Sequence, residues 1–267
     1  MAMTNEQKTQ MKRVIVNCLR NKFQNYNPEP ASMPFHFRLL GKDRMALYSF
    51  MHSLSTNFGT SIFEPVAKSL AQLNFSNVQL QQKAGTQISS EAQRVIQNIM
   101  DNLATAVAIP NKQNEIQAIR NVCQKGEMKT VKPTKIDLKV VGKDNTIYLF
   151  DIKTAKPNAG GFKEFKRTLL EWVAVVLAEN PNVDIKTLIA IPYNPYEPQQ
   201  YNRWTMRGML DLEQELKVAD EFWDFLGGQG SYEELLDCFE KAGIELRPEI
   251  DAFFAKFNCN KNEKRSI

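Results

Sequence analysis

The segment from Lys132 to Lys153 constrains the fold of this chain most, because it holds two apolar runs around a polar turn. Both runs are rich in β-branched and aromatic residues, so they predict a β-hairpin with strands near 135–141 and 146–153. Each strand contains an acid, Asp137 in the first and Asp151 in the second, where a buried strand usually has an apolar residue. The hairpin is therefore the first candidate for a functional site.

The length of the turn decides whether the two acids meet. Side chains alternate along a strand, so Asp151 and Lys153 share one face. If the turn consists of residues 143–145, with Asn145 in the left-handed conformation, Asp137 lies directly opposite Asp151. Directly opposed Cβ atoms are about 5 Å apart, and a divalent cation between the carboxylates would relieve their repulsion. A four-residue turn would send the acids to opposite faces.

Two carboxylates beside a lysine suit the metal-assisted hydrolysis of a phosphodiester. A hard cation polarises the phosphoryl oxygen and lowers the pKa of a bound water, and Lys153 can help to deprotonate that water or steady the developing charge. The alternative is a surface hairpin with solvated charges, because Asp-x-Lys is a common tripeptide. Spacing alone leaves both interpretations open.

Composition excludes several other classes of protein. A chain of 267 residues with 43% hydrophobic content can bury a full core, and we expect a single domain over residues 1–267, either one large domain or one domain with an elaboration. We expect neither a membrane span nor a secretory signal, since no 18-residue apolar run occurs and the start is polar. Four cysteines without paired spacing indicate reduced thiols and a cytoplasmic location. Two distant histidines argue against a histidine zinc site or a Ser-His-Asp triad.

The net charge of +4 is distributed unevenly. Residues 120–167 contain 12 basic and 5 acidic side chains, whereas residues 211–257 contain 4 basic and 13 acidic ones. A basic excess around the hairpin is typical of a site that holds a polyanion against its own carboxylates; for any single lysine, a solvated surface is the alternative. The acidic segment is expected to avoid DNA and to lie in part at a dimer contact.

Residues 1–84 are expected to be helical. The apolar spacing predicts helices at 5–24, 42–57 and 61–73, with 34–40 as an irregular or short extended link. Basic residues gather where this link meets the next helix, and they are candidates for contacts to phosphates or bases: Arg38, Lys42 and Arg44.

Residues 85–210 are expected to form a mixed α/β core. Ser90 and Gln93 have the spacing of a capping box, which places Glu91 in the first turn of a helix. Glu91 either interacts with the helix dipole or reaches the hairpin acids as a further metal or water ligand. The remaining elements are a short helix at 112–124, a first strand at 127–132, an amphipathic helix at 162–179, and a strand at 187–192 parallel to that of Asp151.

Further DNA-binding candidates follow the hairpin. Arginine suits bidentate contact to guanine, and asparagine or glutamine suits adenine. In the loop at 193–207, packing of the arginines on Trp204 or Tyr201 is the competing interpretation. The candidates are Lys156 and Asn158 after the hairpin, Lys163, Lys166 and Arg167 on the polar face of the helix at 162–179, and Arg203 and Arg207 in the loop.

The predicted order is helix, three strands, helix, strand, with an acid on the second strand and Asp-x-Lys closing the third. That order is the common core of the PD-(D/E)xK nuclease superfamily, and the chain as a whole resembles type II restriction endonucleases of the TdeIII family. The resemblance covers nearly the whole chain and includes Pro-Ala-Ser-Met-Pro-Phe-His at 30–36, Gly-Thr-Gln-Ile-Ser-Ser-Glu-Ala-Gln at 85–93, Asp-Ile-Lys-Thr-Ala-Lys-Pro-Asn at 151–158, Ile-Pro-Tyr-Asn-Pro-Tyr at 191–196 and Phe-Trp-Asp-Phe-Leu-Gly-Gly at 222–228.

The resemblance implies Mg²⁺-dependent cleavage of double-stranded DNA by a homodimer, at a GGNCC-like palindrome, with a cognate DNA methyltransferase in the same system. By motif position Asp137 is the first acid, Asp151 the second acid and Lys153 the lysine. The metal is expected on Asp137, Asp151 and the Ile152 carbonyl, with Glu91 as a further candidate. Two positions depart from the common pattern: the proline is Pro133, four residues before the first acid, and the second acid is Asp where many members have Glu.

The expected fold is therefore α/β (an α+β mixed sheet) with a restriction-endonuclease-like core. Helical residues 1–84 and acidic helical residues 211–257 flank that core, and 258–267 form a disordered tail. Two other functions remain open: a nuclease of the same superfamily that serves repair or recombination, and a non-catalytic DNA-binding relative. The intact set of two acids and a lysine argues against the second.

Overall fold

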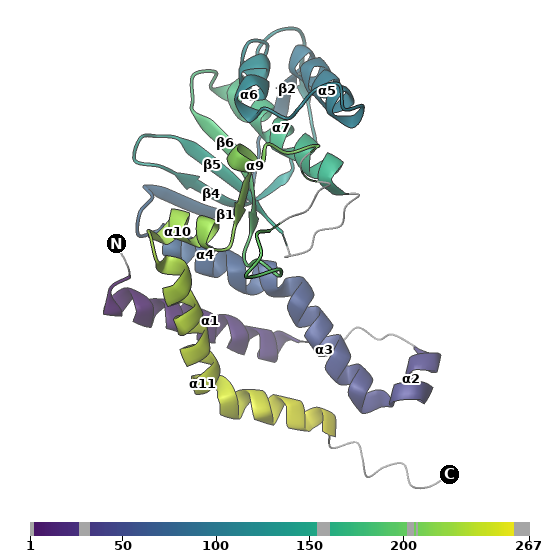
Figure 1. The fold of residues 1–267 in the computed structure, drawn as a ribbon, viewed down its shortest axis with the longest axis vertical. Helices are drawn as coiled ribbons and strands as arrows, with labels where there is room; N and C mark the ends of the chain where they lie inside the picture. Colours follow the sequence, from purple (N-terminus) through teal and green to yellow (C-terminus); the bar gives the residue numbers. More distant parts are fainter. Residues whose placement is uncertain (1–2, 27–32, 154–160, 202–205, 207, 259–267) are drawn as a thin grey trace. The chain divides into compact units, whose positions relative to one another are not determined.

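The computed structural model describes residues 3–26, 33–153, 161–201, 206 and 208–258 (Figure 1). The chain forms two compact units, one of residues 67–232 and the other of residues 2–66 together with 233–267. The expectation of one nuclease domain over the whole chain stays a prediction. Within the described ranges, no helix combines the length and the apolar content needed to cross a membrane.

The unit of residues 67–232 contains a five-stranded mixed sheet. Strand β4 is antiparallel to both β1 and β5, whereas β5, β6 and β7 run parallel to one another. The predicted mixed α/β class and the parallel pairing after the hairpin are therefore confirmed. In sheet order the strands are β1 (Asn77–Lys83), β4 (Lys135–Val141), β5 (Ile147–Ile152), β6 (Ile185–Ile191) and β7 (Leu216–Val218) (Figure 1).

Two strands of this sheet lie where helices were expected. Strand β1 falls in residues 1–84, and β7 interrupts the acidic segment. The predicted strand at 127–132 is real but forms β3 (Met128–Thr130), which pairs with β2 (Gln87–Ser89) in a separate ribbon. Strand β1 has only Val78 and Leu80 as apolar residues, so pairing with β4 overrides its weak local preference.

The hairpin of β4 and β5 has the predicted three-residue turn. Its register runs from Leu138 opposite Phe150 to Val141 opposite Ile147. The Gly142 amide then donates to the Thr146 carbonyl at 2.9 Å, and Asn145 has a φ of 67°. Left-handed backbone of this kind is tolerated by asparagine, which explains its place in the turn.

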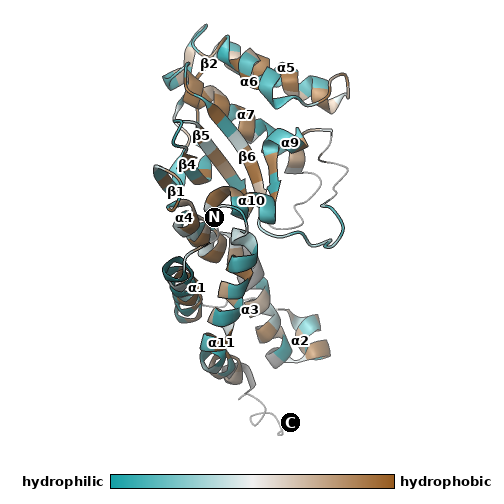
Figure 2. Cartoon of the chain, turned by 60° about the vertical axis from the view of Figure 1, so that its left-hand side comes forward, coloured by the Kyte–Doolittle hydropathy of each residue, from teal (hydrophilic) through white to brown (hydrophobic). Residues whose placement is uncertain are grey.

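Helices cover both faces of the sheet. Leu149 of β5 belongs to an apolar core shared with helix α7, on which α5 and α6 pack. The alternate residues of β5 meet helix α10: the Phe150 ring lies 5.5 Å from Phe222 and the Tyr148 ring 5.0 Å from Phe225. Figure 2 shows apolar residues along β5 and β6. The helices of this unit are α5 (Ser90–Ala104), α6 (Lys112–Arg120), α7 (Phe162–Glu179), α9 (Leu212–Glu215) and α10 (Asp220–Gly227).

Several helix boundaries differ from the prediction. The N-cap of α5 is Ser89, whose Oγ accepts the Ala92 amide, so the predicted capping box at Ser90 is wrong by one residue. The predicted link at 34–40 is a helix, because Pro34 occupies a first-turn position where its missing N–H has no consequence. The predicted break at 58–60 is a π-helical turn that continues the chain between two helices.

The second unit packs helices α1 and α11 together. The Phe23, Phe50 and Phe253 rings form its aromatic centre, with Phe50 and Phe253 centroids 4.6 Å apart. Ion pairs join Lys8 to Glu234 at 2.8 Å and Arg20 to Glu249 at 2.7 Å. The remaining helical elements are α1 (Asn5–Asn25), α2 (Pro34–Leu40), α3 (Lys42–Phe58), η1 (Gly59–Phe63), α4 (Glu64–Ala71), which crosses between the units, and α11 (Ser231–Asn258).

A buried cluster of charges connects α6, α7 and α9. Lys166 Nζ lies 2.5 Å from Glu115 Oε2 and 2.6 Å from Glu215 Oε2, and Lys112 Nζ lies 2.7 Å from Glu215 Oε1. Lys166 is fully buried, so its predicted place on the polar face of α7 is wrong and its ammonium is unavailable to DNA. The lysine is buried because it meets two carboxylates that would otherwise be uncompensated in the core.

The cluster keeps Glu215 ionised. Burial alone would raise the pKa of Glu215, but the ammonium groups of Lys112 and Lys166 outweigh it and lower the pKa below the ordinary glutamate value. A carboxyl group with a lowered folded-state pKa stabilises the fold above its unfolded pKa. That contribution is lost as the pH falls through the lowered value.

We expect Lys166→Met to lower the free energy of unfolding by about 3–5 kcal/mol, because it leaves Glu115 unpaired and Glu215 with one lysine. Lys163→Met on the same helix is the matched control, since Lys163 is exposed and should change stability by no more than about 0.5 kcal/mol. Urea unfolding at pH 7 measures both. Equal effects of the two substitutions would contradict the structural role of the cluster.

Candidate active site

Asp137 and Asp151 lie side by side on neighbouring strands. The register that pairs Leu138 with Phe150 continues to place Asp137 opposite Asp151. Asp137 Oδ2 accepts the Ile152 amide at 2.8 Å, which fixes its carboxylate across the hairpin. Asp151 is buried, with 8% of the residue exposed. The three-residue turn therefore brings the two acids together, which is the arrangement expected for a turn of residues 143–145 and not for the four-residue alternative.

The closeness of the acids shifts the protonation of Asp137. Burial and the negative charge of Asp151 raise the pKa of Asp137 above its ordinary value to about 6, although the Ile152 amide partly opposes the shift. Two carboxylates in this arrangement repel each other whenever both are ionised. The negative charge of the two ionised acids would therefore attract a cation to this site.

Lys153 extends the site beyond the end of β5. Its amide donates to the Ala190 carbonyl at 2.9 Å, so its backbone is still held against β6. Its Nζ lies 2.7 Å from Asp151 Oδ1 and 4.7 Å from the centre of the Phe165 ring. One acid, one ammonium and one aromatic ring are therefore in direct contact next to Asp137.

Glu91 is not brought to this pair. It lies in the first turn of α5, and its Oε2 accepts from Arg94 Nη2 at 2.8 Å. Among the residues that the structure describes, no three side chains of His, Cys, Asp or Glu are placed to hold a metal ion. The position of Glu91 fits the interaction with the helix dipole.

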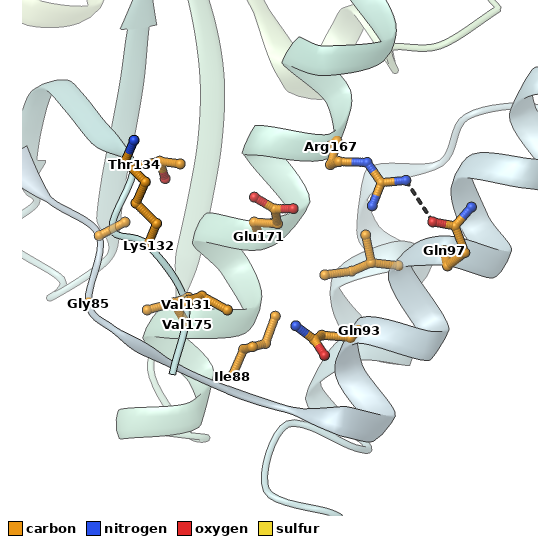
Figure 3. A pocket seen from close by; sticks show the side chains of 12 residues that line it. Gly85, Ile88, Gln93, Gln97, Val131, Lys132, Thr134, Arg167, Glu171 and Val175 are labelled. Atoms are coloured by element: carbon orange, nitrogen blue, oxygen red, sulfur yellow. Dashed lines mark hydrogen bonds between the residues drawn. The ribbon is translucent and has the colours of Figure 1, made fainter. Parts of the chain in front are cut away.

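The basic candidates on α7 have different environments. Lys163 is exposed, Lys166 is buried in the charge cluster, and Arg167 is partly buried, with Nη2 donating to Gln97 Oε1 at 2.8 Å (Figure 3). In the second unit Arg38 and Arg44 are exposed, and Arg44 Nη1 donates to the Leu40 carbonyl at 2.8 Å. The other candidates lie outside the described residues: Lys156, Asn158, Arg203, Arg207 and the side chain of Lys42.

A pocket of about 400 Å³ lies between α5, α7 and the chain around β2 and β3 (Figure 3). Its polar lining includes Gln93 and Gln97 from α5, and Arg167 and Glu171 from α7. Burial raises the pKa of Glu171, and the charge of Arg167 opposes that shift. The sequence analysis did not predict this pocket. The two glutamines are one helical turn apart, as are Arg167 and Glu171, and this spacing could have indicated that each pair faces the same side.

The sequence analysis did not place two other residues, Phe165 and Gln81, near the acids. Phe165 was assigned to the apolar stripe of α7 and not to the surroundings of Lys153. Gln81 has a φ of 57° between two paired residues of β1, and the register places it opposite Asp137. A left-handed glutamine inside a strand is a local strain next to the acids. No spacing in the sequence signals it.

Comparisons with known proteins identify the family of the chain. The family model described as "Type II restriction endonuclease, HinfI" matches residues 3–243. The chain is 26% identical to the type II restriction enzyme MjaII of Methanocaldococcus jannaschii in an alignment of 254 positions, which covers 83% of this chain and 66% of that protein. It is 26% identical to the type II restriction enzyme HgiCII of Herpetosiphon aurantiacus in an alignment of 227 positions, which covers 81% of this chain and 80% of that one.

A third relative, the type II restriction enzyme HgiEI of Herpetosiphon aurantiacus, is 27% identical over 223 residues, covering 81% of this chain and 79% of that one. The expected resemblance to type II restriction endonucleases is confirmed at this level, whereas the TdeIII and PD-(D/E)xK assignments stay predictions. Because the matching model spans most of the sequence, the chain belongs to the HinfI family of type II restriction endonucleases.

Proposed function

We propose that this protein cleaves double-stranded DNA at a short palindrome by metal-dependent hydrolysis of a phosphodiester bond. The observation that carries the proposal is the contact of Asp137 with Asp151 on adjacent strands, with Lys153 paired to Asp151 at 2.7 Å. A chain with only a DNA-binding role has little reason to hold two mutually repelling acids beside a lysine. Membership of a family of restriction endonucleases supports the same reaction.

The donor set fits a magnesium ion. Asp137 and Asp151 supply carboxylate oxygens, and the Ile152 carbonyl is the proposed third protein ligand; such oxygen-only sets suit hard cations. The raised pKa of Asp137 supports this assignment, because burial and the charge of Asp151 raise it and a nearby cation would favour the ionised form. Glu91 is left out, since its carboxylate is paired with Arg94. Bound there, Mg²⁺ would polarise the phosphoryl group and make a water molecule more acidic.

Other groups of the protein hold the reacting side chains in position. The Ile152 amide holds Asp137, and Asp151 holds the ammonium of Lys153. From that position Lys153 orients the attacking water and offsets the negative charge that develops on the phosphoryl oxygens. Pre-alignment of these groups lowers the entropic part of the barrier.

Basic side chains are proposed to hold the DNA around this centre. Exposed Lys163 and partly buried Arg167 both belong to α7, whose residue Phe165 contacts Lys153. Phosphate contacts set the register of the duplex, and arginine forks suit guanine. The further proposed contacts are Arg38, Lys42, Arg44, Lys156, Asn158, Arg203 and Arg207.

A palindromic target suits a two-fold dimer. We propose a homodimer of the TdeIII type, with a GGNCC-like site and a cognate DNA methyltransferase in the same system. Helices α2 and α3 expose large apolar side chains that a second copy would cover, namely Phe35, Leu39, Tyr48 and Met51.

The deciding experiment incubates the full-length protein with plasmid DNA in Mg²⁺ or in EDTA and sequences the fragment ends. Discrete Mg²⁺-dependent ends that share one short palindrome support the proposal and identify the site. Ends that follow DNA structure instead of sequence would indicate a repair or recombination nuclease. Intact DNA with binding retained would indicate a non-catalytic DNA-binding protein.

We expect Asp151→Asn to lower the cleavage rate by about 10³-fold or more while DNA binding persists, because it removes a metal ligand and the partner of Lys153. Asp184→Asn is the matched control, since Asp184 is exposed next to β6 and should have no effect on cleavage. Single-turnover cleavage and gel-shift titration separate the two properties. Parallel losses of binding and cleavage would count against the catalytic role.

Asp137→Asn should abolish cleavage and yet stabilise the metal-free protein. An asparagine can still accept the Ile152 amide and can donate to Asp151, so it removes the repulsion. Because the pKa of Asp137 is raised from 3.8 to about 6, the acid lowers the stability of the fold as the pH rises between these two values, and the full loss remains at higher pH. The expected gain in unfolding free energy at pH 8 is about 1 kcal/mol or more.

Urea unfolding in EDTA at pH 8 and pH 5 measures this effect. The gain should shrink at pH 5, where Asp137 is already protonated in the folded protein. A destabilised Asp137→Asn variant at pH 8 would show that the two acids are not under electrostatic strain.

A further inference from the structure

The ammonium group of Lys153 has two partners on different elements. On one side Nζ lies 2.7 Å from Asp151 Oδ1, and on the other it lies 4.7 Å from the centre of the Phe165 ring. A lysine side chain has four flexible carbons and no fixed direction of its own. An aromatic face within about 6 Å attracts a cation and restricts where it can be. The ring of Phe165 thus limits the positions open to Lys153.

The ring of Phe165 is itself held in place. Gly161 lies one turn earlier, and a Cβ at that position would be 2.9 Å from Phe165 Cζ. The ring of Phe162 meets it edge-on, with centroids 5.8 Å apart and an interplanar angle of 81°. Phe165 can take this position because residue 161 has no side chain.

The turn of α7 that carries Phe165 is also fixed from its buried side. The next residue, Lys166, is fully buried and paired with Glu115 and Glu215. Moving this turn along or around the helix axis would separate a buried ammonium from its carboxylates, which is strongly unfavourable. The buried charge cluster therefore fixes the position of the helical turn that carries the ring of Phe165.

We propose that Phe165 is a positioning residue that sets the direction of the Lys153 ammonium, with Lys166 and its carboxylates fixing the helical turn that carries it. Phe165 acts through Lys153 and is assigned no contact with DNA or metal. The inference rests on the proposed function in so far as Lys153 takes part in cleavage.

The chain offers a matched control for this contact. Lys217 Nζ lies 5.0 Å from the centre of the Phe225 ring, and Phe225 is partly buried, as Phe165 is. This second cation–ring pair involves neither hairpin acid. The same substitution at the two phenylalanines therefore separates positioning of Lys153 from a general loss of aromatic packing.

The kinetic test uses full-length Phe165→Leu, Phe165→Tyr, Phe165→Trp and Phe225→Leu on a duplex carrying the site found by end sequencing. Phe165→Leu should lower kcat by about 10- to 100-fold with KM nearly unchanged, because misplaced catalytic groups cost rate and not binding. Tyrosine and tryptophan keep a ring face and should restore kcat to within about threefold of the wild type. Phe225→Leu should leave kcat unchanged.

A second readout does not depend on cleavage. Reductive methylation with ¹³C-formaldehyde labels the lysines, and Lys153→Arg identifies the Lys153 resonance. The ring current of Phe165 should shift that resonance upfield in the wild type and in Phe165→Tyr, and the shift should vanish in Phe165→Leu. If the wild type shows the shift but does not cleave DNA, the proposed function fails while the positioning stands.

Three outcomes would overturn the inference. The first is a Phe165→Leu protein with unchanged kcat and an unchanged Lys153 resonance. The second is an equal loss of kcat in Phe165→Leu and Phe225→Leu. The third is a failure of tyrosine and tryptophan to restore kcat. Gly161→Ala gives independent support if it displaces the ring and reproduces both effects of Phe165→Leu.

Discussion

The repulsion between two carboxylates on adjacent strands is the constraint around which this structure is arranged. Asp137 and Asp151 meet because a three-residue turn sets the register of the hairpin, and a change of one residue would send them to opposite faces. The fold holds the acids together with the Ile152 amide and with the Lys153 ammonium. The site is thus electrostatically strained before any ligand binds, as is common at functional sites.

A second group of charges lies in the core of the same unit, and in this group the opposite charges compensate one another. At the hairpin, Asp137 and Asp151 face the single ammonium of Lys153, whereas Lys166 and Lys112 neutralise Glu115 and Glu215. Neighbouring residues of α7 join the two groups, since Phe165 contacts Lys153 and Lys166 enters the buried cluster. The compensated cluster gives the strained site a rigid support.

The sequence was most informative where one local rule decides the structure. The alternation of side chains showed that a three-residue turn with a left-handed Asn145 would bring Asp137 and Asp151 together, and the apolar stripe predicted the helix at 162–179. It failed where tertiary contacts override local preference. Strand β1 needs β4 beside it, and Lys166 looked solvent-exposed because its carboxylate partners are about 50 residues away in both directions. The contact of Phe165 with Lys153 likewise depends on tertiary packing that no spacing reveals.

The division of the chain into units affects the order in which they can be completed during synthesis. The unit of residues 67–232 is interrupted by no other segment, so all of its residues leave the ribosome before residue 233. The other unit needs both ends of the chain, because Lys8 and Arg20 of α1 pair with Glu234 and Glu249 of α11. Domains fold as their residues emerge. The strand pair that carries the two acids can therefore form while α1 still lacks its partner helix, so an assembly that depends on the second unit can begin only after residues 233–258 have been made.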